Sequence, residues 1–185
     1  FVITLCILNQ HRNINLQSRV FIEQHCRRIS FSMDYARAQK NNHIISESTA
    51  LIIGGYILKN NSISSKNYIN KGRKNLEIAV KDLIMNDGTF SQYSTNYHRF
   101  FIDTLSSIEI VKNILKIEKF HDQYYKNIKK AIKWLVRLTD PNTGRVPNLG
   151  ANDGSHFYEI ISSCYQDYRP SIQLAANLFL KKATI

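Results

Sequence analysis

Residues 66–88, KNYINKGRKNLEIAVKDLIMNDG, carry the pattern that decides the fold of this chain. Apolar residues recur there at the three-to-four-residue spacing that places side chains on one face of an α-helix, at Ile69, Leu76, Val80 and Leu83. Asp87-Gly88 then supplies the residue types that end a helix. The stretch therefore predicts an amphipathic helix over residues 66–85 that buries one face.

The same spacing continues along most of the chain. Further helices are expected over the ranges 15–30, 41–58, 95–117 and 123–138. Asn41 or Asn42 is a candidate N-cap for the second of these helices. Alternation of the strand type is nearly absent, and residues 138–155 are rich in Asp, Asn, Pro and Gly, which predicts one long loop. The sequence thus indicates an all-α fold built from helical hairpins.

The chain of 185 residues is strongly basic, with 25 Lys and Arg residues against 14 Asp and Glu residues and a net charge of +11. A positive field raises the local concentration of anionic ligands, so the charge favours a polyanionic partner. A solvated, lysine-rich surface explains the same composition. Nucleic acid is not expected, because the sequence lacks zinc-finger ligand spacing, a P-loop and an RNA-recognition signature, and its basic residues are scattered.

The cysteines Cys6, Cys26 and Cys164 are odd in number and lack a CxxC spacing. This argues against a disulfide framework and a structural zinc site, so we expect buried thiols. His43 and Glu47 are four residues apart, but two ligands do not complete a metal site, and neither a metal nor another cofactor is expected. The apolar segment 1–8 is shorter than a membrane span, so none is expected.

Two polar clusters interrupt these helix-like, apolar surroundings. The first is Asn41-Asn42-His43, and the second is Ser94-Thr95-Asn96-Tyr97-His98-Arg99. An amide, imidazoles, a phenol and a guanidinium together can bind a carboxylate and move a proton beside it. Uronic-acid polysaccharides call for this chemistry, so an acidic polysaccharide or oligosaccharide is the expected partner.

Both clusters lie in longer stretches that resemble a known family. Residues 41–51 (NNHIISESTAL), 87–98 (DGTFSQYSTNYH) and 147–154 (PNLGANDG) follow one another in the order seen in the heparinase II/III family. That family, which includes alginate lyase-like enzymes, holds bacterial polysaccharide lyases that cleave heparin-like glycans, alginate and related uronides. The resemblance implies that residues 1–185 form a partial catalytic domain, an incomplete (α/α) toroid, and that the family's C-terminal β-sandwich domain is absent from this chain.

The resemblance also implies roles for individual residues. The family's matching Asn-His pair neutralises the uronate carboxylate and assists removal of the C5 proton, which gives these roles to Asn42 and His43. The matching Tyr is the catalytic acid and sometimes also the base, which gives that role to Tyr97. If the three serve one site, they converge on one cleft. The candidate substrate-binding residues are Asn41, Glu47, His98, Arg99, Asn152 and Asp153.

Structural roles stay open for the same residues, since an Asn can be an N-cap and a Tyr can be a buried aromatic. The favoured function is β-elimination of an acidic polysaccharide, with a uronyl C5 epimerase and a non-catalytic glycan-binding toroid as alternatives. The family's second catalytic His usually comes from the β-sandwich domain, so the isolated chain can be inactive. The resemblance favours the bacterial periplasm or secretion, with the cytoplasm as the alternative.

Overall fold

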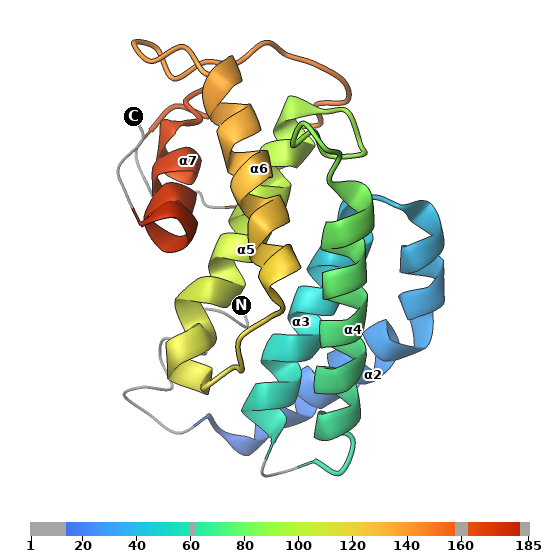
Figure 1. The fold of residues 1–185 in the computed structure, drawn as a ribbon. Coiled ribbons are helices and arrows are strands. Elements are labelled where there is room, and N and C mark those ends of the chain that lie inside the picture. Colours follow the sequence, from blue (N-terminus) through green and yellow to red (C-terminus); the bar gives the residue numbers. More distant parts are fainter. Residues whose placement is uncertain (1–13, 60–61, 158–162, 182–185) are drawn as a thin grey trace. The chain divides into compact units, whose positions relative to one another are not determined.

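The computed structural model describes residues 14–59, 62–157 and 163–181. Within these ranges the regular structure is helical, apart from one isolated antiparallel bridge between Ile84 and Phe90. The elements are α2 (Leu16–Gln39), α3 (Asn42–Leu58), α4 (Ser65–Leu83), α5 (Thr95–Leu115), α6 (Asp122–Leu138), α7 (Arg169–Ala175) and the π-helical turn η1 (Ala176–Leu180) (Figure 1). The prediction of an all-α fold of helical hairpins is confirmed.

The chain divides into two compact units, each of them discontinuous in sequence. Unit 1 comprises residues 1–79 and 107–120, and unit 2 comprises residues 80–106 and 121–185. Unit 1 contains α2 and α3, and unit 2 contains α6, α7 and η1. The helices α4 and α5 each contribute residues to both units.

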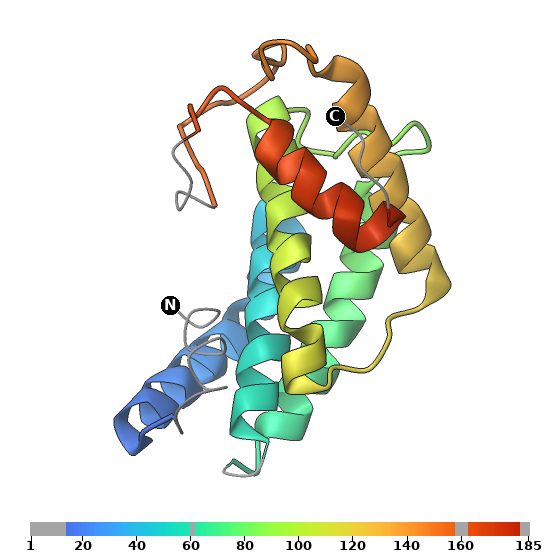
Figure 2. The same ribbon diagram turned by 90° about the vertical axis from the view of Figure 1, so that its left-hand side faces the viewer.

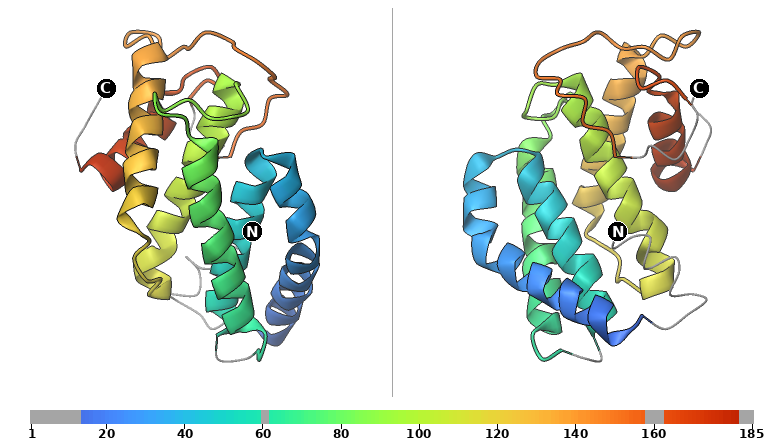
Figure 3. Two further views of the ribbon diagram at one scale, coloured as in Figure 1. Left: turned by 45° about the vertical axis from the view of Figure 1, so that its right-hand side comes forward. Right: turned by 180° about the vertical axis from the view of Figure 1, so that it is seen from behind.

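Unit 1 depends on close contact between α3 and the first part of α4, which lie side by side (Figures 1 and 3). A Cβ atom on Gly55 of α3 would come within 2.9 Å of the Ser65 carbonyl oxygen, and one on Gly72 of α4 within 2.8 Å of the Ser48 carbonyl oxygen. Glycine therefore lets the two backbones approach to a distance that a side chain would prevent. Helix α2 packs on α3 and is also joined to α4 by hydrogen bonds, including one from the Tyr68 hydroxyl to Glu23 at 2.8 Å and one from Arg37 to Asn75 at 2.6 Å.

The helix α2 is longer than the sequence predicts, because it continues beyond residue 30 to Gln39. Its start is as predicted, with the Asn15 side chain accepting a hydrogen bond from the Ser18 amide at 2.8 Å. In the second half Met33 and Ala36 are buried, but Phe31 and Tyr35 are 93% and 71% exposed. These exposed aromatic residues blur the apolar stripe, and they explain why periodicity missed the extension.

Unit 2 is built around the first half of α5. Its core contains Phe90, Phe101 and Leu105 together with Ile128 and Ile132 of α6. Helix α7 runs obliquely across α5 and α6 (Figure 2), and its Ser171 hydroxyl donates a hydrogen bond to the buried Asp103 carboxylate at 3.1 Å. Burial raises the pKa of the Asp103 carboxyl to about 7.

The cysteine prediction is right for one residue and wrong for another. Cys26 is buried, and burial raises its pKa to about 12, whereas Cys164 is exposed because it lies in the irregular segment before α7. Cys6 and the apolar segment 1–8 fall outside the described residues. In the described ranges, every helix is too short or too polar to cross a membrane.

Core packing in unit 1 predicts a large loss of stability for Ile52→Ala. Ile52 is fully buried, so the truncation should cost about 2–5 kcal/mol of unfolding free energy through lost burial and a residual cavity. Ile63→Ala is the matched control, because Ile63 is fully exposed and the same truncation should leave the denaturant midpoint unchanged. Equal midpoints for the two variants in urea unfolding would contradict this packing of α3.

Candidate functional site

The first turn of α5 is tied to the loop 147–154 by hydrogen bonds from Ser94 and Thr95. The Ser94 hydroxyl accepts from the Tyr97 amide at 3.1 Å, as an N-cap does, and donates to the Ala151 carbonyl at 2.5 Å. The Thr95 amide and hydroxyl donate to the carbonyls of Leu149 and Pro147, each at 3.0 Å. The loop is thereby held against the start of the helix that carries Tyr97.

A short hydrogen bond joins Tyr97 to Asp153. The Tyr97 hydroxyl donates to Asp153 Oδ2 at 2.6 Å, while the Ser155 amide donates to Oδ1 of the same carboxylate at 3.0 Å. The phenol, and after it Ser155, lowers the pKa of Asp153 from 3.8 to about 2. The same hydrogen bond, followed by desolvation, raises the pKa of Tyr97. Tyr97 is thus held in its protonated, proton-donating form.

The buried side chain of Arg99 contacts residues around this pair. Its guanidinium stands between the rings of Tyr165 and Tyr168, at 4.5 and 4.2 Å from their centroids. It also donates to the Tyr165 carbonyl at 2.6 Å and to Asn96 Oδ1 at 3.0 Å. Arg99 is fully buried, so it positions the residues that surround it. The contact between Arg99 and substrate that the sequence predicts stays a prediction.

The sequence does not predict that Tyr165 and Asn96 belong to this hydrogen-bond network. The Tyr165 hydroxyl lies 2.8 Å from Asn96 Oδ1 and 2.6 Å from Asn152 Oδ1, and its single proton can serve one of these acceptors at a time. The Asn96 amide in turn lies 3.4 Å from Asp153 Oδ1. Asn96 lies in the second polar cluster of the sequence, but no spacing rule connects it to a tyrosine 69 residues away.

His98 occupies the core of unit 2. Its ring stacks on Trp134 with centroids 4.5 Å apart, and Nε2 lies 2.9 Å from the Ala131 carbonyl, to which it donates. Burial lowers the pKa of His98 to about 4, so the ring is neutral at physiological pH. Neighbouring residues on a helix point in different directions, and here Tyr97 faces the loop while His98 faces α6.

The other predicted residues lie in unit 1, at the start of α3. Of the two candidate N-caps, Asn41 and Asn42, Asn41 is the N-cap of α3, and its side chain accepts a hydrogen bond from the His43 amide at 3.0 Å. Asn42 is the first helical residue and is partly exposed, and His43 is exposed. His43 Nδ1 lies 4.0 Å from Glu47 Oε1, and burial raises the pKa of the Glu47 carboxyl. Since Tyr97 belongs to unit 2, the convergence of Asn42, His43 and Tyr97 stays a prediction.

Over the residues that the structure describes, three or more His, Cys, Asp or Glu side chains do not gather in a way that could hold an ion.

The family model described as heparinase II/III N-terminus matches residues 18–172, which is more than half of the chain. The chain belongs to the heparinase II/III family. No curated protein and no solved structure matches it. Membership makes the chain a domain related to polysaccharide lyases, and the matched range includes both polar clusters and the loop 147–154 of this heparinase II/III domain.

The Tyr97–Asp153 hydrogen bond predicts a coupled titration in this heparinase II/III domain. In the wild type, the Asp153 carboxyl should titrate near pH 2, and in Tyr97→Phe its pKa should rise toward 3.8, since the phenol is the largest cause of the shift. Carbon-detected NMR of the carboxyl groups measures both values. Asp87 is an internal control, because its pKa is lowered by Thr89 and should not respond. An unchanged Asp153 titration in Tyr97→Phe would mean that the two side chains do not touch in solution.

Proposed function

We propose that this chain carries part of the active site of a lyase that cleaves a uronic-acid-containing polysaccharide by β-elimination. The observation that supports this most is the Tyr97 phenol, which is partly exposed and kept protonated by Asp153 at 2.6 Å. A protonated phenol at a helix start can donate to the oxygen of a leaving sugar. Family membership supports a polysaccharide as the substrate.

In the proposed reaction, a base removes the proton from C5 of the uronate. The C5–H electron pair becomes the C4=C5 double bond, and the C4–O4 bond breaks with its electron pair passing to O4. Tyr97 gives its proton to O4, so the leaving sugar departs as an alcohol. The base then holds one proton more and Tyr97 one fewer, and exchange with solvent restores both.

Asn42 and His43 are proposed for the first half of this reaction. The amide of Asn42 donates to the substrate carboxylate, which stabilises the negative charge that develops there as C5 is deprotonated. Neutral His43 accepts the C5 proton, and Glu47, 4.0 Å from its Nδ1, orients the ring. Support for these two roles comes from the family motif and from the accessibility of both side chains at the start of α3.

Asp153 is proposed as the positioning residue for Tyr97. It fixes the phenol through a hydrogen bond to one carboxylate oxygen, while the Ser155 amide and the more distant Asn96 amide bind the other. When substrate arrives, the phenol exchanges Asp153 for the glycosidic oxygen. Because the alkoxide that leaves is a stronger base than phenolate, a raised Tyr97 pKa does not prevent the transfer.

Turnover measurements separate this role from packing. Tyr97→Phe removes one hydroxyl and keeps the ring, so β-elimination by the full-length protein should fall by about 10²–10⁴-fold with little change in melting temperature. Asn42→Ala should cost about 10²–10³-fold, the usual loss for a donor to a developing oxyanion. Tyr35→Phe is the matched control and should keep full turnover, because Tyr35 is 71% exposed on α2. The unsaturated uronide product is followed by its ultraviolet absorbance.

The products distinguish the alternatives. Solvent deuterium at C5 without chain cleavage would identify a uronyl C5 epimerase, which shares the first proton transfer. Glycan binding without either product would identify a non-catalytic domain. Full turnover in Tyr97→Phe would show that the phenol is not the proton donor.

A further inference from the structure

A pocket of about 210 Å³ in unit 2 is lined by residues that neighbour Asp153 in the chain or in the hydrogen-bond network, and it is not used by the reaction above. Its polar lining comes from the loop 145–152 and from the segment before α7, namely Arg145, Asn148, Asn152, Tyr165 and Gln166. Two of these, Tyr165 and Asn152, are joined by a 2.6 Å contact and connect through Asn96 to Asp153. The pocket therefore adjoins the proposed site within one unit.

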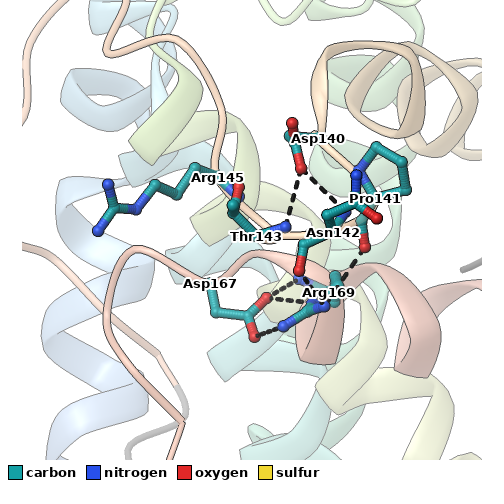
Figure 4. A network of polar contacts seen from close by, with 7 residues as sticks. All are labelled: Asp140, Pro141, Asn142, Thr143, Arg145, Asp167 and Arg169. Carbon is teal, nitrogen blue, oxygen red and sulfur yellow. Dashed lines mark hydrogen bonds and ion pairs between the residues drawn. The ribbon is translucent and has the colours of Figure 1, made fainter.

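Arg145 is the cation of this pocket, and its charge is uncompensated. The side chain is exposed, and within the described part of the chain its guanidinium makes neither a hydrogen bond nor an ion pair. The neighbouring carboxylates, Asp167 and Asp140, already have hydrogen-bond partners other than the Arg145 side chain. Asp167 pairs with Arg169 through two contacts of 2.9 and 2.7 Å, and Asp140 accepts from the amides of Asn142 and Thr143 (Figure 4).

The same network holds the Arg145 backbone in place while its side chain points away. The Arg145 carbonyl accepts from the Asp140 amide at 2.9 Å, and the Arg145 amide lies 3.3 Å from the Thr143 hydroxyl. Arg169 closes the turn from the other side by donating to the carbonyls of Pro141 and Asn142. Figure 4 shows the guanidinium of Arg145 directed away from the Asp167–Arg169 pair. The turn at residues 140–145 therefore has a fixed backbone, and it carries a guanidinium that is free to bind a ligand.

We infer that this pocket is a second sugar subsite, in which Arg145 binds the carboxylate or sulfate of a neighbouring acidic residue of the polysaccharide. A guanidinium binds such groups through two parallel hydrogen bonds, and the amides of Asn148, Asn152 and Gln166 suit sugar hydroxyls. The inference rests on the proposed function for its substrate class. It adds that recognition requires an anionic group on a sugar next to the cleaved bond.

Binding of defined oligosaccharides tests this inference without turnover. The probes are an alginate-derived hexasaccharide, its carboxyl-reduced counterpart and a sulfated dextran oligomer of similar length, each titrated by calorimetry at low salt. Arg145→Gln should weaken binding of at least one anionic probe by about tenfold, because a charge-assisted bidentate contact is lost. Binding of the carboxyl-reduced probe should not change. The anionic probe that responds identifies carboxylate or sulfate as the recognised group.

Two further variants keep the test decisive. Arg27→Gln is the matched control, because Arg27 is exposed on α2 and its substitution changes the net charge by the same amount. This variant should change the affinity less than twofold. Arg145→Lys keeps the charge but loses the bidentate geometry of the guanidinium, so it should bind the responsive probe with an intermediate affinity. It also tests the inference if the Gln variant does not fold. If Arg145→Gln and Arg27→Gln bind all probes alike, or if no probe binds the wild type, the inference is wrong.

Failure of this inference can be told apart from failure of the proposed function. A full-length protein that forms unsaturated uronide while Arg145→Gln binds every probe like the wild type would refute the subsite alone. Selective loss of anionic binding in Arg145→Gln, in a protein that forms no unsaturated product, would refute the lyase and leave the subsite.

Discussion

The Ser94 hydroxyl makes the contact on which the proposed active site depends. It caps α5 by accepting from the Tyr97 amide and donates its own proton to the Ala151 carbonyl. One side chain thus fixes both the start of the helix that carries Tyr97 and the loop that carries Asp153. The glycine that follows Leu149 permits the contact, because Gly150 has φ of 70° and a Cβ there would collide with the Tyr93 carbonyl.

The polarity of the pair follows from this arrangement. Asp153 is solvent-exposed yet strongly acidic, because a phenol and Ser155 stabilise its charge, and Tyr97 is less acidic for the same reason. A phenol with a raised pKa is suited to donate a proton and is poorly suited to accept one. The two arginines of this region differ in role. Arg99 is buried between two tyrosine rings and supports the site, whereas Arg145 is exposed and unpaired.

The sequence predicts the helices well, because burial of one face imposes the spacing that makes them visible. It predicts an N-cap at Asn41 or Asn42 from the residue type, and the structure has the N-cap at Asn41. It does not predict that Tyr97 turns to the loop while His98 turns to Trp134, since both lie in one polar cluster and differ only in direction. The contact between Tyr165 and Asn96 is also invisible, because it depends on tertiary packing over 69 residues.

A substrate whose leaving group needs no proton shows whether Tyr97 donates the proton to the leaving oxygen. A uronide with fluoride in place of the C4 oxygen substituent loses its leaving group without protonation. If Tyr97 is the proton donor, Tyr97→Phe in the full-length protein should process this substrate at nearly the wild-type rate and fail on the natural linkage. An equal loss on both substrates would show that Tyr97 acts before the leaving group departs and is not the proton donor.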